Sequence, residues 1–299
     1  MLVVDAGNAL FEGPNFADPG RGKAKAEFIL RTMGELKTAA MAVGARDLTL
    51  GPDFLAQAAR KAGVPLLSAN LVRAGKPIFP ASTTVTVAGV KIGLIGISPP
   101  LPPTDQFPSV RGDPPVKAAL AEAGKLRGKV DLVVALAAVS YADALQLAKD
   151  GGPLFDLVLE SGEMRPLGSM QQSERAYVVA AGERGRGMGM LELDLSAGGN
   201  GPLLDVASIE RDRTRQRNLE TQVQEVKRRL ATQNDPAVVK SYQQALASFE
   251  DQIRQIQASK PEERAKGART VRLATQFLDE SVPDDPELKA QVDKLQPPS

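Results

Sequence analysis

Histidine and cysteine are both absent from the 299 residues of this chain. Without cysteine there is no disulfide, no thiolate nucleophile and no sulfur-ligated zinc. Without histidine there is no imidazole metal ligand, and Ser-His-Asp catalysis is excluded. Any metal site would therefore be built from oxygen ligands, which suit ions such as Mn²⁺ or Mg²⁺.

Aromatic residues are also scarce, at 4% of the chain, and tryptophan is absent, so stacking surfaces for bases or sugars are poor. Lys+Arg number 37 and Asp+Glu 36, which leaves a net charge of +1. This balance provides no general attraction to nucleic acid or to anionic lipid. No uninterrupted apolar run approaches the roughly 20 residues that a membrane span needs. We therefore expect no nucleic-acid partner and no membrane span.

The length predicts about two folding units, and the hydrophobic content of 42% is enough for a sizeable core. The first 200 residues alternate short apolar runs with helical stretches, which is typical of a layered α/β domain with a mixed sheet. Strands are expected at Leu2–Val4, Ala40–Val43, Pro65–Ala69, Thr83–Val87, Lys91–Ile97, Leu132–Ala138, Phe155–Leu159, Ala176–Ala180 and Met190–Leu195. We expect Thr83–Val87 and Lys91–Ile97 to form a hairpin joined at Ala88-Gly89, and Ala176–Ala180 and Met190–Leu195 to form a last strand pair. Helices are expected at Ala24–Lys37, Phe54–Ala62, Val116–Leu126 and Asp143–Lys149. Because a buried strand begins directly after Met1, we expect an upstream segment, and no signal peptide is visible.

Beyond residue 204 the pattern becomes helical, with apolar residues in heptad spacing. It predicts two antiparallel helices, Ile209–Thr232 and Pro236–Ala258, the second capped by Asp235. A third helix is expected at Pro261–Leu278, and a short one at Pro286–Leu295 in a Pro- and Asp-rich tail. The predicted domains are residues 1–204 (α/β), 205–280 (helical) and 281–299 (linker or tail). The heptad seam can close inside the hairpin or form a dimer surface.

Six stretches along the first part of the chain carry a resemblance to a known family. They are VDAGN (4–8), VGARD (43–47), LLSANL (66–71), GVKIGLIGI (89–97), VDLVVAL (130–136) and FDLVL (155–159). In this order and spacing, over roughly residues 2–195, they resemble the N-terminal domain of the 5′-nucleotidase branch of the calcineurin-like metallophosphoesterases. The resemblance implies a four-layer αββα sandwich of mixed sheets, here lacking its first strand and followed by the α-helical hairpin extension. It also implies two metal ions at the strand ends, which activate a water to attack phosphorus.

The positions that match the metal ligands of this family carry other residues. Asn8 stands where the family has a bridging aspartate, and Ala45 and Arg46 replace the Asn and His of its Gly-Asn-His-Glu motif. Ala138 stands where a later His is expected, and the final Gly-His-x-His stretch aligns near Glu163. The positions of the former site are Asp5, Asn8, Ala45, Arg46, Asp47, Ala138 and Glu163.

The resemblance therefore argues against the family's activity and predicts a pseudoenzyme that acts as a binding or scaffolding module, with no catalytic residue and no cofactor. One alternative is an active or weakly active metal-dependent phosphoester (nucleotide) hydrolase. It would hold Mn²⁺ or Mg²⁺ at an oxygen-only site made from Asp5, Asp47, Glu160 and Glu163. Another alternative is an anion or nucleotide receptor without chemistry. Its candidate contacts are Arg46, Arg184 and Arg186, with the Pro-rich segment 99–115 as a cleft wall.

Two surfaces are candidates for a protein partner: the helical hairpin Ile209–Ala258 and the face of the former active site. The segment Asp284–Asp293 looks like the Asp-Pro-Glu-x-Lys segment that closes some nucleotidase-like domains. In certain bacterial proteins such a domain is followed by a multihaem cytochrome c module, so the resemblance implies a c-type cytochrome as a neighbour. It also implies an extracytoplasmic location, periplasmic or secreted.

Overall fold

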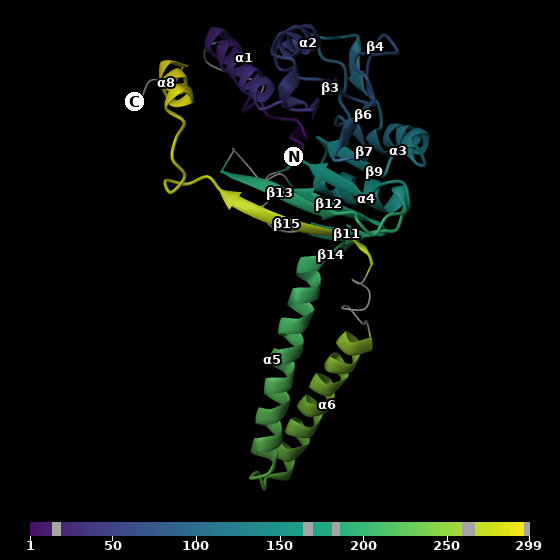
Figure 1. The fold of residues 1–299 in the computed structure, drawn as a ribbon, viewed down its shortest axis with the longest axis vertical. Helices are drawn as coiled ribbons and strands as arrows, with labels where there is room; N and C mark the ends of the chain where they lie inside the picture. The colour runs from purple at the N-terminus through teal and green to yellow at the C-terminus, as the bar shows by residue number, and fades with distance from the viewer. Residues whose placement is uncertain (14–18, 164–169, 181–185, 259–266, 296–299) are drawn as a thin grey trace. The chain divides into compact units, whose positions relative to one another are not determined.

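A computed structural model describes residues 1–13, 19–163, 170–180, 186–258 and 267–295 of the chain (Figure 1). The chain divides into two compact units. Unit 1 comprises Met1–Met190 together with Ala274–Ser299, and unit 2 comprises Leu191–Leu273. The hairpin helices therefore lie in an insertion, because the chain returns to unit 1 after them. The domain limits predicted at residues 204 and 280 stay a prediction.

The main sheet of unit 1 has six strands in the order β11-β12-β10-β9-β7-β6. Its inner strands β7, β9, β10 and β12 run parallel, and its edge strands β6 and β11 pair antiparallel with their neighbours. This confirms the predicted mixed sheet. The strands are β6 (Ser82–Val87), β7 (Val90–Ile97), β9 (Leu132–Ala137), β10 (Leu157–Glu160), β11 (Met170–Ser173) and β12 (Ala176–Ala180).

A second sheet in unit 1 consists of three parallel strands in the order β1-β2-β3. These strands are β1 (Val4–Asp5), β2 (Ala40–Ala42) and β3 (Leu66–Leu67). The strands β2 and β3 contact β7 of the main sheet. Gly96 in β7 makes this close approach possible, because a Cβ atom at this position would lie 2.5 Å from the Cβ of Leu67 and closer still to the Leu67 carbonyl.

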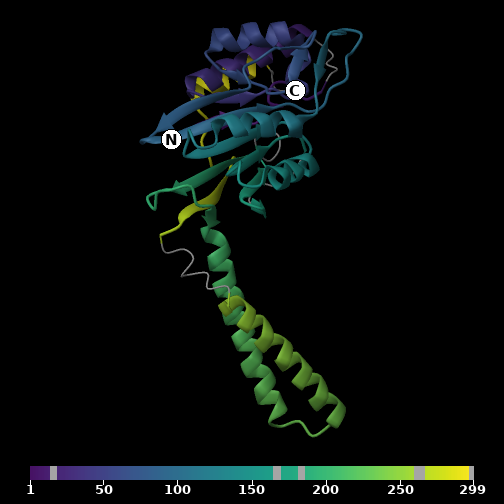
Figure 2. The same ribbon diagram turned by 90° about the vertical axis from the view of Figure 1, so that its right-hand side faces the viewer.

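Helices cover both sheets. The helices α1 (Pro19–Glu35) and α2 (Gly51–Ala62) contact each other and enclose one apolar cluster together with β2 and β3. The helices α3 (Pro115–Leu126) and α4 (Tyr141–Gly151) pack on the main sheet and form a second cluster. All six residues of β9 are buried, which explains its uninterrupted apolar sequence. Figure 2 shows the helices of unit 1 on its sheets from a second direction.

Short elements complete unit 1. The Pro-rich segment 99–115 contains a three-residue strand, β8 (Val110–Gly112), which pairs with β4 (Leu71–Arg73); β4 pairs in turn with β5 (Lys76–Pro77). The C-terminal helix α8 (Pro286–Leu295) has the predicted bounds. It contacts α1, where the Arg21 side chain donates a hydrogen bond of 2.7 Å to the Leu295 carbonyl.

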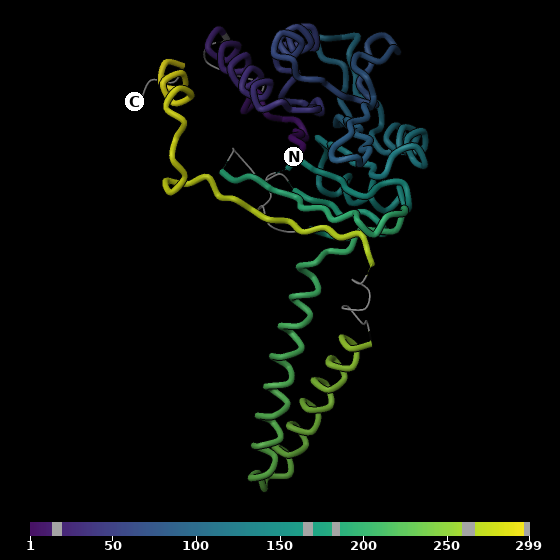
Figure 3. Tube along the Cα trace, in the orientation of Figure 1, coloured from purple at the N-terminus to yellow at the C-terminus, as the bar shows by residue number. Residues whose placement is uncertain are grey.

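Unit 2 contains the predicted helical hairpin. The helix α5 (Val206–Leu230) contacts α6 (Pro236–Ala258), and Asp235 caps α6 by accepting a hydrogen bond of 2.8 Å from the Ala237 amide. The hairpin follows β14 (Leu203–Asp205), and the course of the chain through both helices can be traced in Figure 3. None of the helices in the described ranges is both long and apolar enough to cross a membrane.

The third helix predicted at Pro261–Leu278 is wrong. Residues 261–266 lie outside the described ranges, and Arg269–Phe277 is the strand β15. It forms a three-stranded sheet with β13 (Gly187–Asp194) and β14, in the order β13-β15-β14. Leu203 pairs with Arg269 in parallel register, so the partner strand is separated from β15 by the whole hairpin. Pairing between strands so far apart along the chain has no local signal in the sequence. The positions of Val271 and Leu273 are compatible with either a helix or a strand.

The predicted pairing of Ala176–Ala180 with Met190–Leu195 is also wrong. Both strands form, but the first pairs with β10 and β11 and the second pairs with β15. The neighbour of Ala176–Ala180 in sequence is β11, which sequence analysis did not predict because its residues are polar.

Candidate functional site at the strand ends

The residues of the predicted former site gather where strands of the two sheets of unit 1 end. β1 leads into the turn that carries Asn8, and β2 leads through Gly44 into the 3₁₀ turn Arg46–Leu48. The strands β9 and β10 end beside this place. The Ser161 hydroxyl, after β10, donates a hydrogen bond of 2.7 Å to the Ala6 carbonyl. Ala138, after β9, has its Cβ 3.1 Å from the position that a Cβ on Gly7 would occupy.

Asp47 is buried, and its carboxylate is used to fix the turns. Its Oδ2 accepts hydrogen bonds from the amides of Asn8 (2.7 Å) and Gly44 (2.8 Å), and its Oδ1 accepts one from Leu10 (3.1 Å). Burial raises the pKa of Asp47, and these amides oppose the rise. The carboxylate thus connects the β1 and β2 turns, which gives this buried acid a structural role.

Asn8 adopts a left-handed backbone with φ of 62°, a conformation that asparagine tolerates better than most residues. Its side-chain Nδ2 donates to the Ser161 carbonyl at 3.1 Å, and its Oδ1 accepts from the Arg46 amide at 3.2 Å. The amide therefore links the turns that follow β1, β2 and β10. A carboxylate in its place has no proton to donate to Ser161.

Asp5 is the second acid at this place. Its Oδ1 accepts a hydrogen bond of 2.7 Å from the Gly7 amide. Burial raises the pKa of Asp5 to about 6, an effect that the Gly7 amide opposes and the nearby charge of Asp47 adds to. With this pKa, Asp5 is mostly ionised at pH 7 and becomes neutral below about pH 6.

Of the other predicted positions, Ala45, Arg46 and Ala138 have no side-chain oxygen that could bind a cation. Ala45 and Arg46 are exposed, and Ala138 is buried. Glu160 is buried, and its Oε1 accepts a hydrogen bond of 2.7 Å from the amide of the exposed Glu163.

The two metal ions implied by the resemblance do not fit these side chains. Across the ranges that the structure describes, no group of three or more His, Cys, Asp or Glu residues is placed so that it could hold a metal ion. The carboxylate of Asp47 faces three amides, and the position of the bridging aspartate is an amide that bonds protein groups on both sides.

The structure does not test the predicted anion contacts at Arg46, Arg184 and Arg186. Arg46 presents an exposed side chain at the rim of the strand-end site. Arg186 contributes its carbonyl to a hydrogen bond of 2.9 Å from the Leu278 amide. Arg184 lies outside the described residues, so the grouping of these three arginines stays a prediction.

A buried polar cluster behind the β2 turn was missed from sequence. The Ser98 hydroxyl donates to the Val43 carbonyl at 2.5 Å and lies 2.8 Å from the Ser68 hydroxyl. The Asn70 side chain bonds both backbone groups of Ser98, at 2.8 Å and 2.9 Å. A sequence signal for this cluster exists, because Ser68, Asn70 and Ser98 follow the apolar strands β3 and β7 within three residues. The cluster holds the turn that leads to Gly44 and Asp47.

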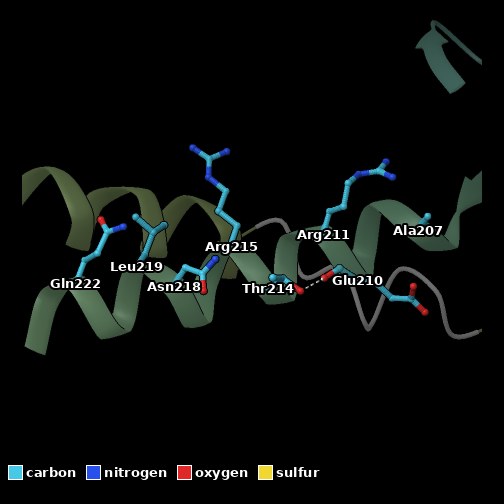
Figure 4. A pocket seen from close by; sticks show the side chains of 8 residues that line it. All are labelled: Ala207, Glu210, Arg211, Thr214, Arg215, Asn218, Leu219 and Gln222. Atoms are coloured by element: carbon cyan, nitrogen blue, oxygen red, sulfur yellow. Dashed lines mark hydrogen bonds between the residues drawn. The ribbon is translucent and has the colours of Figure 1, made fainter. Parts of the chain in front are cut away.

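A shallow groove lies along α5 in unit 2, away from any predicted site residue in the sequence. Figure 4 shows its eight lining residues, which are Ala207, Glu210, Arg211, Thr214, Arg215, Asn218, Leu219 and Gln222. The two arginines are engaged: Arg211 bonds Asp205 at 2.8 Å, and Arg215 bonds Gln252 at 2.9 Å. The charged side chains of the groove thus bind other residues of unit 2, and the groove gives no indication of a ligand.

Comparison with known proteins finds several nucleotidase- and phosphoesterase-like proteins that are similar to this chain. No family model matches the chain. An apyrase from Aedes albopictus is 31% identical over 168 residues, which cover 53% of this chain and 29% of the apyrase. The structure of a 5′-nucleotidase precursor from Thermus thermophilus superposes with a TM-score of 0.55 and 27% identity, over 68% of this chain and 43% of that protein. A calcineurin-like phosphoesterase from Bacillus subtilis superposes with a TM-score of 0.51 and 19% identity, over 64% of this chain and 70% of that protein. The chain thus spans less than half the length of the apyrase and of the 5′-nucleotidase.

Proposed function

We propose that this chain, a relative of the calcineurin-like metallophosphoesterases and of 5′-nucleotidase N-terminal domains, is a pseudoenzyme that works as a binding or scaffolding module. In this proposal the four-layer αββα arrangement of its relatives is kept as a framework, and the metal-dependent chemistry is lost. The single observation that carries the proposal is the bonding of Asn8. Its amide joins the Ser161 carbonyl to the Arg46 amide at the place where the relatives would bridge two cations.

The neighbouring acids support the same interpretation. Asp47 accepts hydrogen bonds from three backbone amides, and Asp5 accepts one from the Gly7 amide, so both carboxylates already hold the turns. Two-metal hydrolysis needs ionised ligands that hold both cations and a water between them. The strand ends of this chain instead hold one another through direct hydrogen bonds. They form a closed framework that stabilises the fold and leaves its surface for binding.

The test is a metal and activity measurement on the purified chain. Metal content would be determined by elemental analysis after dialysis against metal-free buffer, and again after Mn²⁺ loading. Hydrolysis of a phosphodiester dye and of nucleoside monophosphates would be followed with and without Mn²⁺. We expect no retained metal and no turnover above buffer. About two retained equivalents with turnover would overturn the proposal in favour of a hydrolase.

A second candidate function is a receptor for a phosphate-bearing anion. It is favoured by the exposed guanidinium of Arg46, which directly follows Ala45 at the rim of the strand ends. Inorganic phosphate and AMP would then raise the melting temperature of the chain. The Arg46→Ala variant would lose this rise, whereas Arg60→Ala, which removes an exposed arginine from α2, would keep it.

The proposed binding role has two candidate surfaces, the helical hairpin and the strand-end face around Arg46. We further propose an extracytoplasmic location and a c-type cytochrome module as a neighbour. Both follow from the resemblance of the sequence, and the apyrase and 5′-nucleotidase similarities are compatible with them. Fractionation of the source cells, with detection of the chain and of haem in the same complex, tests both.

A further inference from the structure

The strand β13 lies at the edge of its three-stranded sheet, next to β15 (Figure 1). In the part of the chain that the structure describes, β15 is its only partner strand. Met188 and Met190 of β13 are 50% and 43% exposed, and Phe277 and Leu278 at the adjoining end of β15 are 60% and 47% exposed. Proteins commonly protect an edge strand with Lys, Pro or a bulge, and β13 contains neither Lys nor Pro. This edge is therefore open to pairing with another strand.

The backbone groups of β13 alternate between its two edges. The Leu278 amide donates a hydrogen bond of 2.9 Å to the Arg186 carbonyl, so the residue just before β13 turns its backbone groups toward the end of β15. Successive residues of a strand turn their N–H and C=O groups in opposite directions. The residues that turn these groups to the open edge are therefore Gly187, Gly189, Leu191 and Leu193.

The side chains of this strand also alternate, between the two faces of the sheet. One face carries only glycine and leucine, whereas the other carries the charged residues and the methionines: Arg186, Met188, Met190, Glu192 and Asp194. Arg186 and Asp194, at opposite ends of this row, are both exposed, and neither forms an ion pair within the described ranges. The row thus begins with a positive charge and ends with a negative one, which makes it complementary to a copy of itself that runs in the opposite direction.

We propose that β13 pairs antiparallel with β13 of a second copy of this chain, across a two-fold axis at Met190, so that two three-stranded sheets join into one. Met190 is the midpoint of residues 186–194. Pairing about it places Arg186, four residues before the axis, opposite Asp194 of the partner subunit, four residues after it and on the same face. The symmetry creates this ion pair twice, once at each end of the paired strands.

The same register satisfies the backbone and the other face of the sheet. It sets Gly187 opposite Leu193, and Gly189 opposite Leu191, so the residues whose backbone groups are turned outward form the hydrogen-bonded pairs of an antiparallel ladder. Each leucine meets a glycine, which leaves room for the larger side chain. Met190 meets its own copy in a non-hydrogen-bonded pair, where side chains are closest. Backbone, packing and charge thus agree on one register.

A second copy fits this edge better than a peptide of uniform charge, because the two ends of the row carry opposite charges. The inference goes beyond the proposed function, since it uses neither the helical hairpin nor the strand-end face. It is compatible with an active or an inactive strand-end site, so failure of one proposal can be told from failure of the other. Arg186, a predicted anion contact, here binds a carboxylate of the second copy.

The experiment is sedimentation equilibrium of the full chain over a range of concentrations, and the wild-type chain is expected to be a dimer. Gly189→Pro removes an amide that is turned to the open edge, so the ladder with β15 is kept while pairing with the second copy is blocked. It should weaken the dimer by about 100-fold or more. Gly189→Ala keeps the amide and should change the affinity by less than about threefold. Circular dichroism and thermal unfolding of each variant show that the fold is retained.

A charge reversal tests the pairing of the strand ends. Arg186→Glu should weaken the dimer by about tenfold, because two attractive contacts become repulsive. Adding Asp194→Arg to this variant should restore the wild-type affinity. Arg217→Glu makes the same charge change at an exposed position of α5 and should leave the dimer unchanged.

Single cysteines test the register directly, because the chain contains no other cysteine. Met190→Cys places two thiols at the axis, where the Cα atoms of a non-hydrogen-bonded pair lie about 4.5 Å apart, within the range of a disulfide. Oxidation with diamide should therefore crosslink this variant into a covalent dimer. Met188→Cys is the matched control, since its two copies are four residues out of step, about 13 Å apart, and should stay uncrosslinked.

Three results would overturn the proposal. The first is a wild-type chain that is monomeric at every concentration. The second is a dimer that Gly189→Pro leaves intact, which would place the interface elsewhere. The third is crosslinking of Met188→Cys as efficient as that of Met190→Cys, which would exclude an axis at Met190.

Discussion

Asn8→Asp restores the residue type that the relatives have at the metal bridge, and its effect distinguishes a structural role from a catalytic one. In this structure Asn8 Nδ2 donates to the Ser161 carbonyl at 3.1 Å. A carboxylate cannot donate, so the carbonyl loses its partner, which costs about 1–2 kcal/mol for a half-buried group. The charge is also added beside the buried carboxylate of Asp47, whose Oδ2 lies 2.7 Å from the Asn8 amide nitrogen. Together these effects predict a loss of stability of about 2–3 kcal/mol at neutral pH.

The assay is thermal and urea-induced unfolding of the wild-type chain and the variant, at pH 7.5 and at pH 5. A loss of this size lowers the melting temperature by about 4–8 °C in a chain of this length. At acid pH the introduced carboxyl becomes protonated and can again donate to Ser161, so the loss should shrink. Asn8→Gly is the control. It keeps the positive φ and removes both side-chain bonds without adding charge, so its cost should not depend on pH.

The same assay is repeated with Mn²⁺. If the strand ends are a metal centre, Asn8→Asp will bind Mn²⁺ more tightly, and the variant will be stabilised by the metal. A variant that is as stable as wild type without metal, or more stable than wild type with it, would refute the structural role assigned to the Asn8 amide.

Two further predictions concern acids and glycines of unit 1. Asp5→Asn should stabilise the chain by about 2–3 kcal/mol at pH 7, because the folded chain holds the pKa of Asp5 at about 6 against an ordinary value of 3.8. Because the folded chain raises the pKa of Asp5, ionisation of Asp5 lowers the stability of the wild-type chain as pH rises from about 4 to above 6. The stability advantage of Asp5→Asn should therefore vanish near pH 4 in urea titrations. An advantage that stays constant with pH would contradict this. Gly96→Ala should cost about 1–3 kcal/mol because its Cβ would meet the Leu67 backbone, whereas Gly124→Ala in α3, where a Cβ meets nothing within 4 Å, should be neutral or stabilising. Equal effects of the two glycine substitutions in denaturant unfolding would count against the close approach of β7 and β3.

Much of the fold was predictable because its signals are local. The hairpin of β6 and β7 was predicted with its turn at Ala88 and Gly89, and both turn residues have the positive φ that a tight hairpin turn needs, 50° and 81°. The start of α6 was predicted from Asp235 followed by Pro236, and the structure shows the expected cap. These features depend on neighbours within a few residues, so the sequence contains them in full.

The errors involve partners that are distant along the chain. The strand β15 was predicted as a helix because its apolar residues fit both a helical and a strand periodicity. Its partner β14 lies before the hairpin, and the parallel pairing of Leu203 with Arg269 makes this segment a strand. At the strand ends, sequence analysis identified Asp5, Asn8 and Asp47. It did not show that Ser161, more than 150 positions away, would meet the Asn8 side chain. Contacts between residues so far apart along the chain depend on the order of strands in the sheets, which cannot be deduced from the local pattern of a single sequence.

In the function that we propose, the strand ends hold each other through hydrogen bonds and bind no metal ions. Elemental analysis of the purified chain after Mn²⁺ loading and exhaustive dialysis tests it most directly, with phosphodiester hydrolysis measured on the same sample. We expect no retained Mn²⁺ and no hydrolysis above buffer. About two retained equivalents, with turnover that Asp47→Asn abolishes, would contradict it.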